Sequence, residues 1–313
     1  MGASRPNGGS SHLSLLRQKQ LKVVYLTFSS LPPLGNYYAE SRGVCQWRST
    51  NVQKLKRMQE RDHRTGQAQM SNRVFLHGVP DTPRIWSALL EALGEDVLTP
   101  CLPGFCTLPP EGFQCTKDEY AEWLVRLLEE RYAKFGPIDI FGHDWGALLT
   151  LRAVSLRPDL IKSWAISGAV IDPRYRGHAV ARIWNTPLAG EIAMALSPKK
   201  MMEIIFRLSG LPQDIAKQKA STWRPYMRQS ILALYRSASA LRFDGDWVER
   251  LENLSKYGLL IWGSEDPYVS LLVARRFAEK HRAELYIEHG AGHWAIVERP
   301  RSISEALQAH WAK

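Results

Sequence analysis

At positions 142–146 the chain reads Gly142-His143-Asp144-Trp145-Gly146, and this turn lies between two apolar stretches. The stretch 137–141 is typical of a short buried strand, and the stretch 147–154 is typical of a helix. Glycines on both sides of Asp144 suit a sharp turn that holds one side chain at the end of a sheet, which is a nucleophile elbow with Asp in place of Ser. The same residues also suit an ordinary turn with an N-cap, so motifs elsewhere in the chain must decide.

Three further motifs follow predicted strands. Upstream, a strand ends in the His-Gly-x-Pro turn at 77–80; downstream, one strand is followed by Asp266 and the last strand by His293. The order nucleophile, acid, histidine is that of α/β-hydrolases and differs from the order in chymotrypsin and subtilisin. With these four motifs the chain resembles the α/β-hydrolase superfamily from Met70 to the C-terminus. The Asp at the elbow resembles the branch that contains epoxide hydrolases and haloalkane dehalogenases.

A carboxylate at the elbow implies a particular chemistry. It attacks a carbonyl carbon poorly, but it can attack an sp3 carbon that bears an epoxide oxygen or a halide, which would leave an ester on Asp144. His293 would then act as the base on the water that hydrolyses this ester. Asp266 is predicted to orient His293 and to stabilise its protonated form. Glu265 is adjacent and stays open as an alternative, and Asp172, which follows the preceding strand, is a second alternative.

The resemblance also implies how the oxyanion of ester hydrolysis would be stabilised. The donors would be the backbone N–H groups of Val79 and Trp145. His77 is predicted to be structural and to support this loop through hydrogen bonds. The four cysteines show no spacing typical of a metal site. Neither a metal nor a cofactor is expected.

The leaving group separates the two enzyme classes. An epoxide leaves an alkoxide, which needs a proton donor, and the segment 232–238 resembles the one that carries a tyrosine for this role; Tyr235 is therefore the predicted acid. The second tyrosine that the resemblance implies is not evident, because the corresponding region offers Trp184, and Tyr175 and Tyr226 are other possibilities. A halide needs only N–H donors, which Trp145 and Trp184 would supply.

The pattern of elements predicts an α/β-hydrolase fold, with a mostly parallel sheet, helices on both faces and an inserted helical cap. The predicted core spans 70–168 and 245–313, with helices at 117–134 and 270–281. The predicted cap spans 169–244 and contains helical segments near 179–184, 190–195, 199–208, 212–219 and 224–240. Six strands are expected near 73–77, 96–100, 138–142, 162–167, 258–262 and 283–288.

Two usual early strands are expected to be missing, since 46–69 is polar and lacks alternation. Their absence would leave Asp96–Pro100 at a sheet edge. The segment 21–28 has the composition of a strand but no predicted partner.

The net charge of +10 is concentrated at the N-terminus. Residues 1–69 hold eleven Lys or Arg and three acids, a net of 11 − 3 = +8, so the rest of the chain is near neutral at 30 bases against 28 acids. We interpret 1–69 as a basic extension, either a targeting peptide or sequence upstream of a start at Met70, and expect it to be dispensable for catalysis. A nucleic-acid partner is not expected.

The cysteines predict no disulfide framework and thus a reducing, cytoplasmic location. No apolar run approaches the roughly 20 residues of a membrane span.

The predicted function is an epoxide hydrolase with the triad Asp144, His293 and Asp266. A haloalkane dehalogenase is the alternative, and a non-catalytic binder of small ligands on the same fold is an alternative of another class. The expected partners are a small apolar substrate and water, with no membrane partner, and a homodimer is possible.

Overall fold

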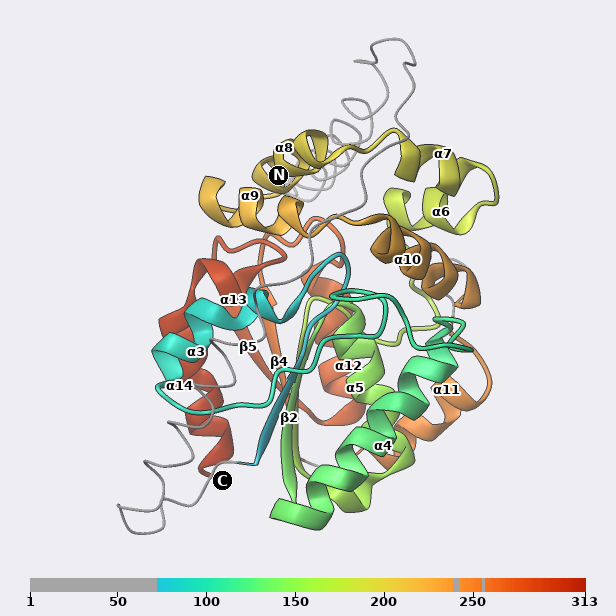
Figure 1. Ribbon diagram of the computed structural model, residues 1–313. Helices are drawn as coiled ribbons and strands as arrows, with labels where there is room; N and C mark the ends of the chain where they lie inside the picture. Colours follow the sequence, from blue (N-terminus) through green and yellow to red (C-terminus); the bar gives the residue numbers. More distant parts are fainter. Residues whose placement is uncertain (1–71, 239–242, 255–256) are drawn as a thin grey trace, which may run out of the picture.

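The computed structural model describes residues 72–238, 243–254 and 257–313. They form a five-stranded parallel sheet in the order β1-β2-β3-β4-β5 (Figure 1). The strands are β1 (Arg73–Leu76), β2 (Ile138–His143), β3 (Ile161–Ser167), β4 (Gly258–Gly263) and β5 (Glu284–Glu288). Because every pair is parallel, the carboxyl ends of all the strands lie at one edge. Five of the six predicted strands are confirmed.

The sixth prediction, a strand at 96–100, is wrong. This segment makes a single parallel bridge between Leu98 and Val74, beside β1 at the edge of the sheet. The N–H of Phe75 donates to the Leu98 carbonyl at 2.9 Å, and the N–H of Leu98 donates to the Arg73 carbonyl at 3.0 Å. The next donor in such a ladder would be residue 100. That residue is Pro100, which has no N–H, so the pairing stops after one bridge.

Helices pack on both faces of the sheet (Figure 1). The long α4 (Lys117–Phe135) begins with a capping box between Thr116 and Glu119, and α5 (Trp145–Leu156) follows the elbow with nearly every residue buried. The predicted helices at 117–134 and 270–281 are confirmed. The other flanking elements are α3 (Ser87–Leu93), α11 (Asp246–Glu249), α12 (Leu271–His281), α13 (Ala295–Glu298), α14 (Pro300–Trp311), and the short η1 (Pro83–Trp86), η2 (Pro158–Leu160) and η3 (Arg250–Asn253).

Five helices lie between β3 and α11 in the described part of the chain. They are α6 (Ala179–Asn185), α7 (Ala189–Ala195), α8 (Lys199–Leu208), α9 (Gln213–Ser221) and α10 (Pro225–Ser237), close to the predicted helical segments. They lie over the carboxyl ends of the strands (Figure 1). We call them the helical insertion.

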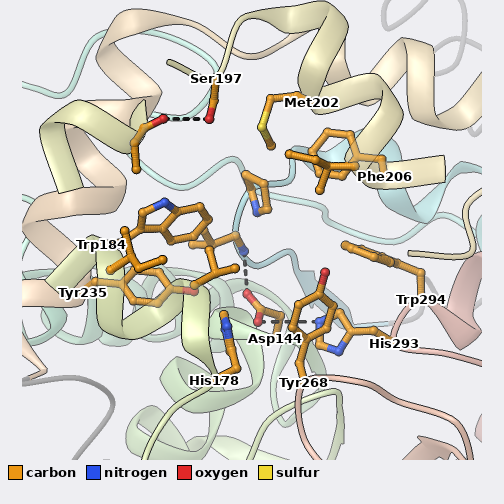
Figure 2. A pocket seen from close by; sticks show the side chains of 16 residues that line it. Asp144, His178, Trp184, Ser197, Met202, Phe206, Tyr235, Tyr268, His293 and Trp294 are labelled. Carbon is orange, nitrogen blue, oxygen red and sulfur yellow. Dashed lines mark hydrogen bonds and ion pairs between the residues drawn. The ribbon is translucent and has the colours of Figure 1, made fainter. Parts of the chain in front are cut away.

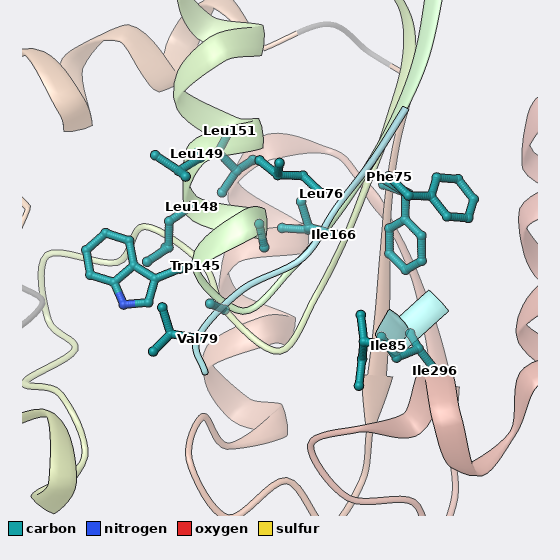
Figure 3. Close-up of a cluster of buried hydrophobic side chains, with 14 of the residues drawn as sticks. Phe75, Leu76, Val79, Ile85, Trp145, Leu148, Leu149, Leu151, Ile166 and Ile296 are labelled. Carbon is teal, nitrogen blue, oxygen red and sulfur yellow. The ribbon is translucent and has the colours of Figure 1, made fainter. Parts of the chain in front are cut away.

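The core lies on both sides of the sheet. Buried side chains lie on both sides of the strands, with Phe75, Ile85 and Ile296 on one side and the leucines of α5 on the other (Figure 3). All six residues of β2 are buried, as expected for a central parallel strand with helices on both faces. The elbow therefore lies at the end of a fully buried strand.

The cysteine prediction is wrong in one respect. Cys101 and Cys106 form a disulfide, and their Cα atoms are 6.2 Å apart, inside the usual range of about 4.4–6.8 Å. The turn at 103–105 between them closes this short loop, and the spacing alone did not indicate it. Cys115 is buried and unpaired. The cysteines therefore no longer indicate a reducing compartment. The cytoplasmic location stays a prediction.

The predictions for 1–69, for the early strands and for the segment 21–28 concern residues outside the described ones. Within the described ranges, no helix is both long and apolar enough to cross a membrane.

Candidate active site

Asp144 occupies a tight turn between β2 and α5. Its φ of 54° lies in the left-handed region, which a non-glycine residue adopts only with strain. The turn also needs its glycines, because a Cβ atom at Gly146 would lie 2.1 Å from the backbone oxygen of Leu76. The local sequence thus holds the Asp144 side chain at the carboxyl end of the sheet, in the geometry of an elbow.

The two oxygens of Asp144 have different surroundings. Oδ1 accepts a hydrogen bond from the N–H of Val79 at 2.6 Å, and Oδ2 lies 3.7 Å from Nε2 of His293. Burial alone would raise the pKa of this carboxyl, but the nearby His293 imidazole, together with the Val79 N–H, outweighs it and lowers the pKa. Asp144 is therefore ionised at neutral pH, as a nucleophile requires.

His293 bridges Asp144 and Asp266. Its Nδ1 lies 2.8 Å from Oδ2 of Asp266, and the other oxygen of Asp266 accepts the backbone N–H groups of Tyr268 at 2.7 Å and Val269 at 3.0 Å. Burial alone would lower the pKa of the imidazole, but Asp266 and Asp144 outweigh it and raise the pKa to about 10. Asp266 thus holds Nε2 of His293 toward Asp144.

The two other candidate acids lie elsewhere. Asp172 accepts hydrogen bonds from the Arg276 guanidinium and from the Arg174 backbone N–H, each at 2.8 Å. Glu265 is exposed. Of the three acids that the sequence left open, the structure brings Asp266 to His293.

His77 supports the loop that carries Val79, as expected. Its Nδ1 donates to the Gly78 carbonyl at 3.0 Å, and its Nε2 accepts from the N–H of Leu102 at 3.1 Å, which is the pattern of a neutral imidazole. The N–H of Trp145 is the first of α5, where no carbonyl within the helix is available to it. Of the two predicted oxyanion donors, the Val79 N–H is bonded to the Asp144 carboxylate, and the Trp145 N–H directly follows Asp144 in the chain.

An apolar pocket opens above Asp144, between the sheet and the helical insertion (Figure 2). Asp144, His293, Tyr235 and Trp184 all line it. The remaining lining residues are mainly aliphatic and aromatic: Val79, Pro80, Val180, Ile183, Ala193, Met202, Ile205, Phe206 and Trp294, with His178, Ser197 and Tyr268. Such a lining suits a small apolar molecule held near a few polar groups.

Tyr235 is 2% exposed, and its hydroxyl points toward Asp144 (Figure 2). Trp145 and Trp184 pack edge-on against its ring, with centroids 5.3 and 5.2 Å away. Burial, with the nearby charge of Asp144, raises the pKa of this hydroxyl well above its usual value. Tyr235 is therefore a neutral donor at neutral pH.

The other tyrosine candidates are engaged elsewhere. The hydroxyl of Tyr175 donates to the backbone oxygen of Tyr268 at 2.9 Å, and that of Tyr226 donates to the backbone oxygen of Cys106 at 3.0 Å. The Trp145 indole N–H approaches the Tyr235 hydroxyl but makes no well-directed hydrogen bond among the described residues.

Sequence reasoning missed several polar residues at the site. His178 and Tyr268 line the pocket. His143 is fully buried beside His293, with ring centroids 4.9 Å apart, and burial holds its pKa well below the usual value. Tyr268 lies two residues after Asp266, so proximity in the chain was a usable signal; the pattern around His178 carried none.

A buried ion pair joins the insertion to the core beside the pocket. Lys219 of α9 pairs with Asp81, which follows the His-Gly-x-Pro turn, and their side chains are 4% and 2% exposed. The other oxygen of Asp81 accepts the indole N–H of Trp294 at 3.3 Å. The Lys219 ammonium also lies 4.4 Å from the centre of the Trp294 ring. No sequence motif indicated this pair.

Comparison with known proteins supports the same fold. The sequence model described as "Alpha/beta hydrolase family" matches residues 74–306. The chain belongs to this family. This alpha/beta hydrolase is similar to an (E)-2-((N-methylformamido)methylene)succinate hydrolase of Acinetobacter baylyi, with 22% identity over 75% of this chain and 88% of that protein.

Two further similarities are to an epoxide hydrolase and to a haloalkane dehalogenase. Epoxide hydrolase 2 of Siraitia grosvenorii is 30% identical over a shorter stretch, 29% of each chain. The structure of a haloalkane dehalogenase loop variant of Bradyrhizobium elkanii superposes with a TM-score of 0.63 at 22% identity, over 79% of this chain and 92% of that chain. The structural likeness at this identity concerns the fold.

Proposed function

We propose that this alpha/beta hydrolase opens epoxides to diols through an ester on Asp144. The free oxygen of Asp144, Oδ2, attacks an epoxide carbon, and the carbon–oxygen bond breaks as Tyr235 protonates the departing oxygen. His293 then takes a proton from water, and the hydroxide attacks the carboxyl carbon of the ester. The N–H groups of Val79 and Trp145 stabilise the resulting oxyanion before the diol leaves.

The charge of Asp144 controls when His293 can act as a base. In the resting enzyme the imidazole holds its proton because two carboxylates face it. Formation of the ester removes the charge of Asp144 and leaves only Asp266. The pKa of His293 must then fall, because one of the two attractions is lost. The proton returns to the Tyr235 oxygen or to solvent, and the neutral imidazole can activate water.

One observation carries the proposal. The Asp144 carboxylate is held at the elbow by Val79, with its second oxygen beside His293, under an apolar pocket into which Tyr235 presents a neutral hydroxyl. We propose that the helical insertion acts as the cap predicted for 169–244 and excludes water from this pocket.

A haloalkane dehalogenase is the second candidate. The buried Trp145 indole N–H, without a well-directed hydrogen bond in the described part of the chain, favours it as a halide donor. The predicted partner donor, Trp184, is placed less well, because its indole nitrogen lies on the side of the ring away from Asp144 in Figure 2. Epoxide opening is therefore our first choice.

Parallel assays of styrene oxide and 1-bromobutane, which report diol and bromide, test the choice. We expect diol formation and, in His293→Gln, an ester on Asp144 detected by mass spectrometry. Asp144→Asn is the matched control, because it keeps the size of the side chain and removes the nucleophile. Bromide release alone would favour the dehalogenase. Binding of substrate with neither product and no ester would favour the non-catalytic binder.

A further inference from the structure

His178 is a polar residue of the pocket that the proposed mechanism has not used. It directly precedes α6 and lines the pocket together with Asp144, Tyr235 and His293. Its ring lies beside Asp144, between Tyr235 and Tyr268 (Figure 2). The ring of Tyr268 packs edge-on against it, with centroids 5.0 Å apart. His178 is thus held by packing at the place where the proposed reaction occurs.

The start of α6 determines which nitrogen of His178 carries the proton. The backbone N–H of Ala181 donates to Nδ1 of His178 at 3.2 Å, so Nδ1 is an acceptor in the N-cap of the helix. Burial is the main reason that the pKa of His178 falls to about 4, although the charge of Asp144 opposes the change. The ring is therefore neutral at neutral pH, and the proton is on Nε2. His178 presents one N–H donor and no charge.

The other hydroxyl groups of the pocket are already committed to neighbours. Ser197 donates to the Ala193 carbonyl at 2.7 Å. The hydroxyl of Tyr268 lies 3.1 Å from the hydroxyl of Ser209, which itself donates to the Ile205 carbonyl at 2.8 Å and can therefore accept from Tyr268. His293 is occupied between two carboxylates. Tyr235 and His178 are left as donors beside the Asp144 carboxylate.

We propose that Nε2–H of His178 is a second hydrogen-bond donor to the oxygen that departs when Asp144 opens the epoxide. The inference rests on the proposed function. As the bond between the epoxide carbon and oxygen breaks, the electron pair moves to the oxygen, Tyr235 supplies the proton, and His178 stabilises the developing negative charge while keeping its own proton. A neutral donor suits this site, because it keeps its own proton and adds no second positive charge beside Asp144, which already faces His293.

Two substitutions separate this role from helix capping. His178→Asn keeps an oxygen that can accept the Ala181 N–H but removes the donor at the position of Nε2. His178→Gln reaches far enough to place an amide N–H near that position but loses the cap. A donor role predicts slow chemistry in the Asn variant and partial recovery in the Gln variant. A role limited to capping predicts the reverse order.

The measurement is the rate of ester formation in the His293→Gln background, by quenched mass spectrometry with styrene oxide. We expect His178→Asn to slow ester formation by about 10–100-fold, because one of two donors to the leaving oxygen is lost. The melting temperature of His178→Asn should stay unchanged, and that of His178→Gln should fall. When His178→Asn is made with His293 intact, the rate of ester hydrolysis should equal that of the wild type, because this step does not use His178.

The outcomes distinguish the two proposals. Ester formation at the same rate in His178→Asn and its parent would overturn the role of His178 while leaving the epoxide mechanism intact. If the His293→Gln parent forms no ester with styrene oxide or other terminal epoxides, the epoxide mechanism itself is wrong, and the role of His178 is wrong with it.

Discussion

The buried pair of Lys219 and Asp81 offers a sharp test of how the helical insertion is held on the core. Lys219→Met keeps most of the apolar stem and removes the ammonium, which lies over the rings of Trp294 and Phe206. Asp81 is 2% exposed and would lose its ion-pair partner, while the indole N–H of Trp294 would remain as a hydrogen-bond donor. Removal of one partner from a buried pair costs about 3–5 kcal/mol.

This cost is large for the stability of a domain. It corresponds to a fall in melting temperature of roughly 10 °C for a chain of this size. Burial already lowers the pKa of Lys219 despite the nearby Asp81, so keeping the charged pair is itself costly. We therefore expect the double variant Lys219→Met with Asp81→Leu to recover most of the loss.

Thermal and urea unfolding of the wild type, both single variants and the double variant give the coupling energy directly. Lys162→Met is the control, because this lysine is exposed and lies 4.0 Å from its acid. A loss below about 1 kcal/mol in Lys219→Met, as for an exposed ion pair, would refute the reasoning. A double variant less stable than either single variant would refute it as well. We also expect a raised KM in Lys219→Met, because Trp294 lines the pocket.

Three further predictions follow from the site. Tyr235→Phe should slow epoxide opening by about 100–1000-fold without loss of stability, as expected for a general acid, and diol formation at the wild-type rate would exclude this role. The pKa of His293 in the folded protein is raised to about 10. The stabilisation by its positive charge is therefore fully present below the pKa of the unfolded chain and is lost as the pH rises toward 10. The difference in the free energy of unfolding between wild type and His293→Gln should shrink over that range. Gly146→Ala should prevent folding or displace the elbow, because its Cβ would meet the backbone of Leu76. Gly94→Ala is the control: its Cβ meets nothing within 4 Å, and its positive φ should lower the free energy of unfolding by only about 1 kcal/mol. Equal effects of the two variants on circular dichroism and melting temperature would contradict the steric argument.

The sequence by itself determined the elements and their order. The glycines around Asp144 and the apolar runs before and after them are local signals, so the elbow, five strands and the helical segments of the insertion were predictable. Because strands of a parallel sheet end at one edge, the loops that carry Asp144, Asp266 and His293 were expected to converge there.

The tertiary structure decided which polar groups meet. Asp172 and Asp266 both follow strands, and only their packing directs Asp172 to Arg276 and Asp266 to His293. Lys219 meets Asp81 across 138 positions of the chain. Burial, distance and the direction of a side chain depend on the whole packed molecule, so no local pattern could encode them.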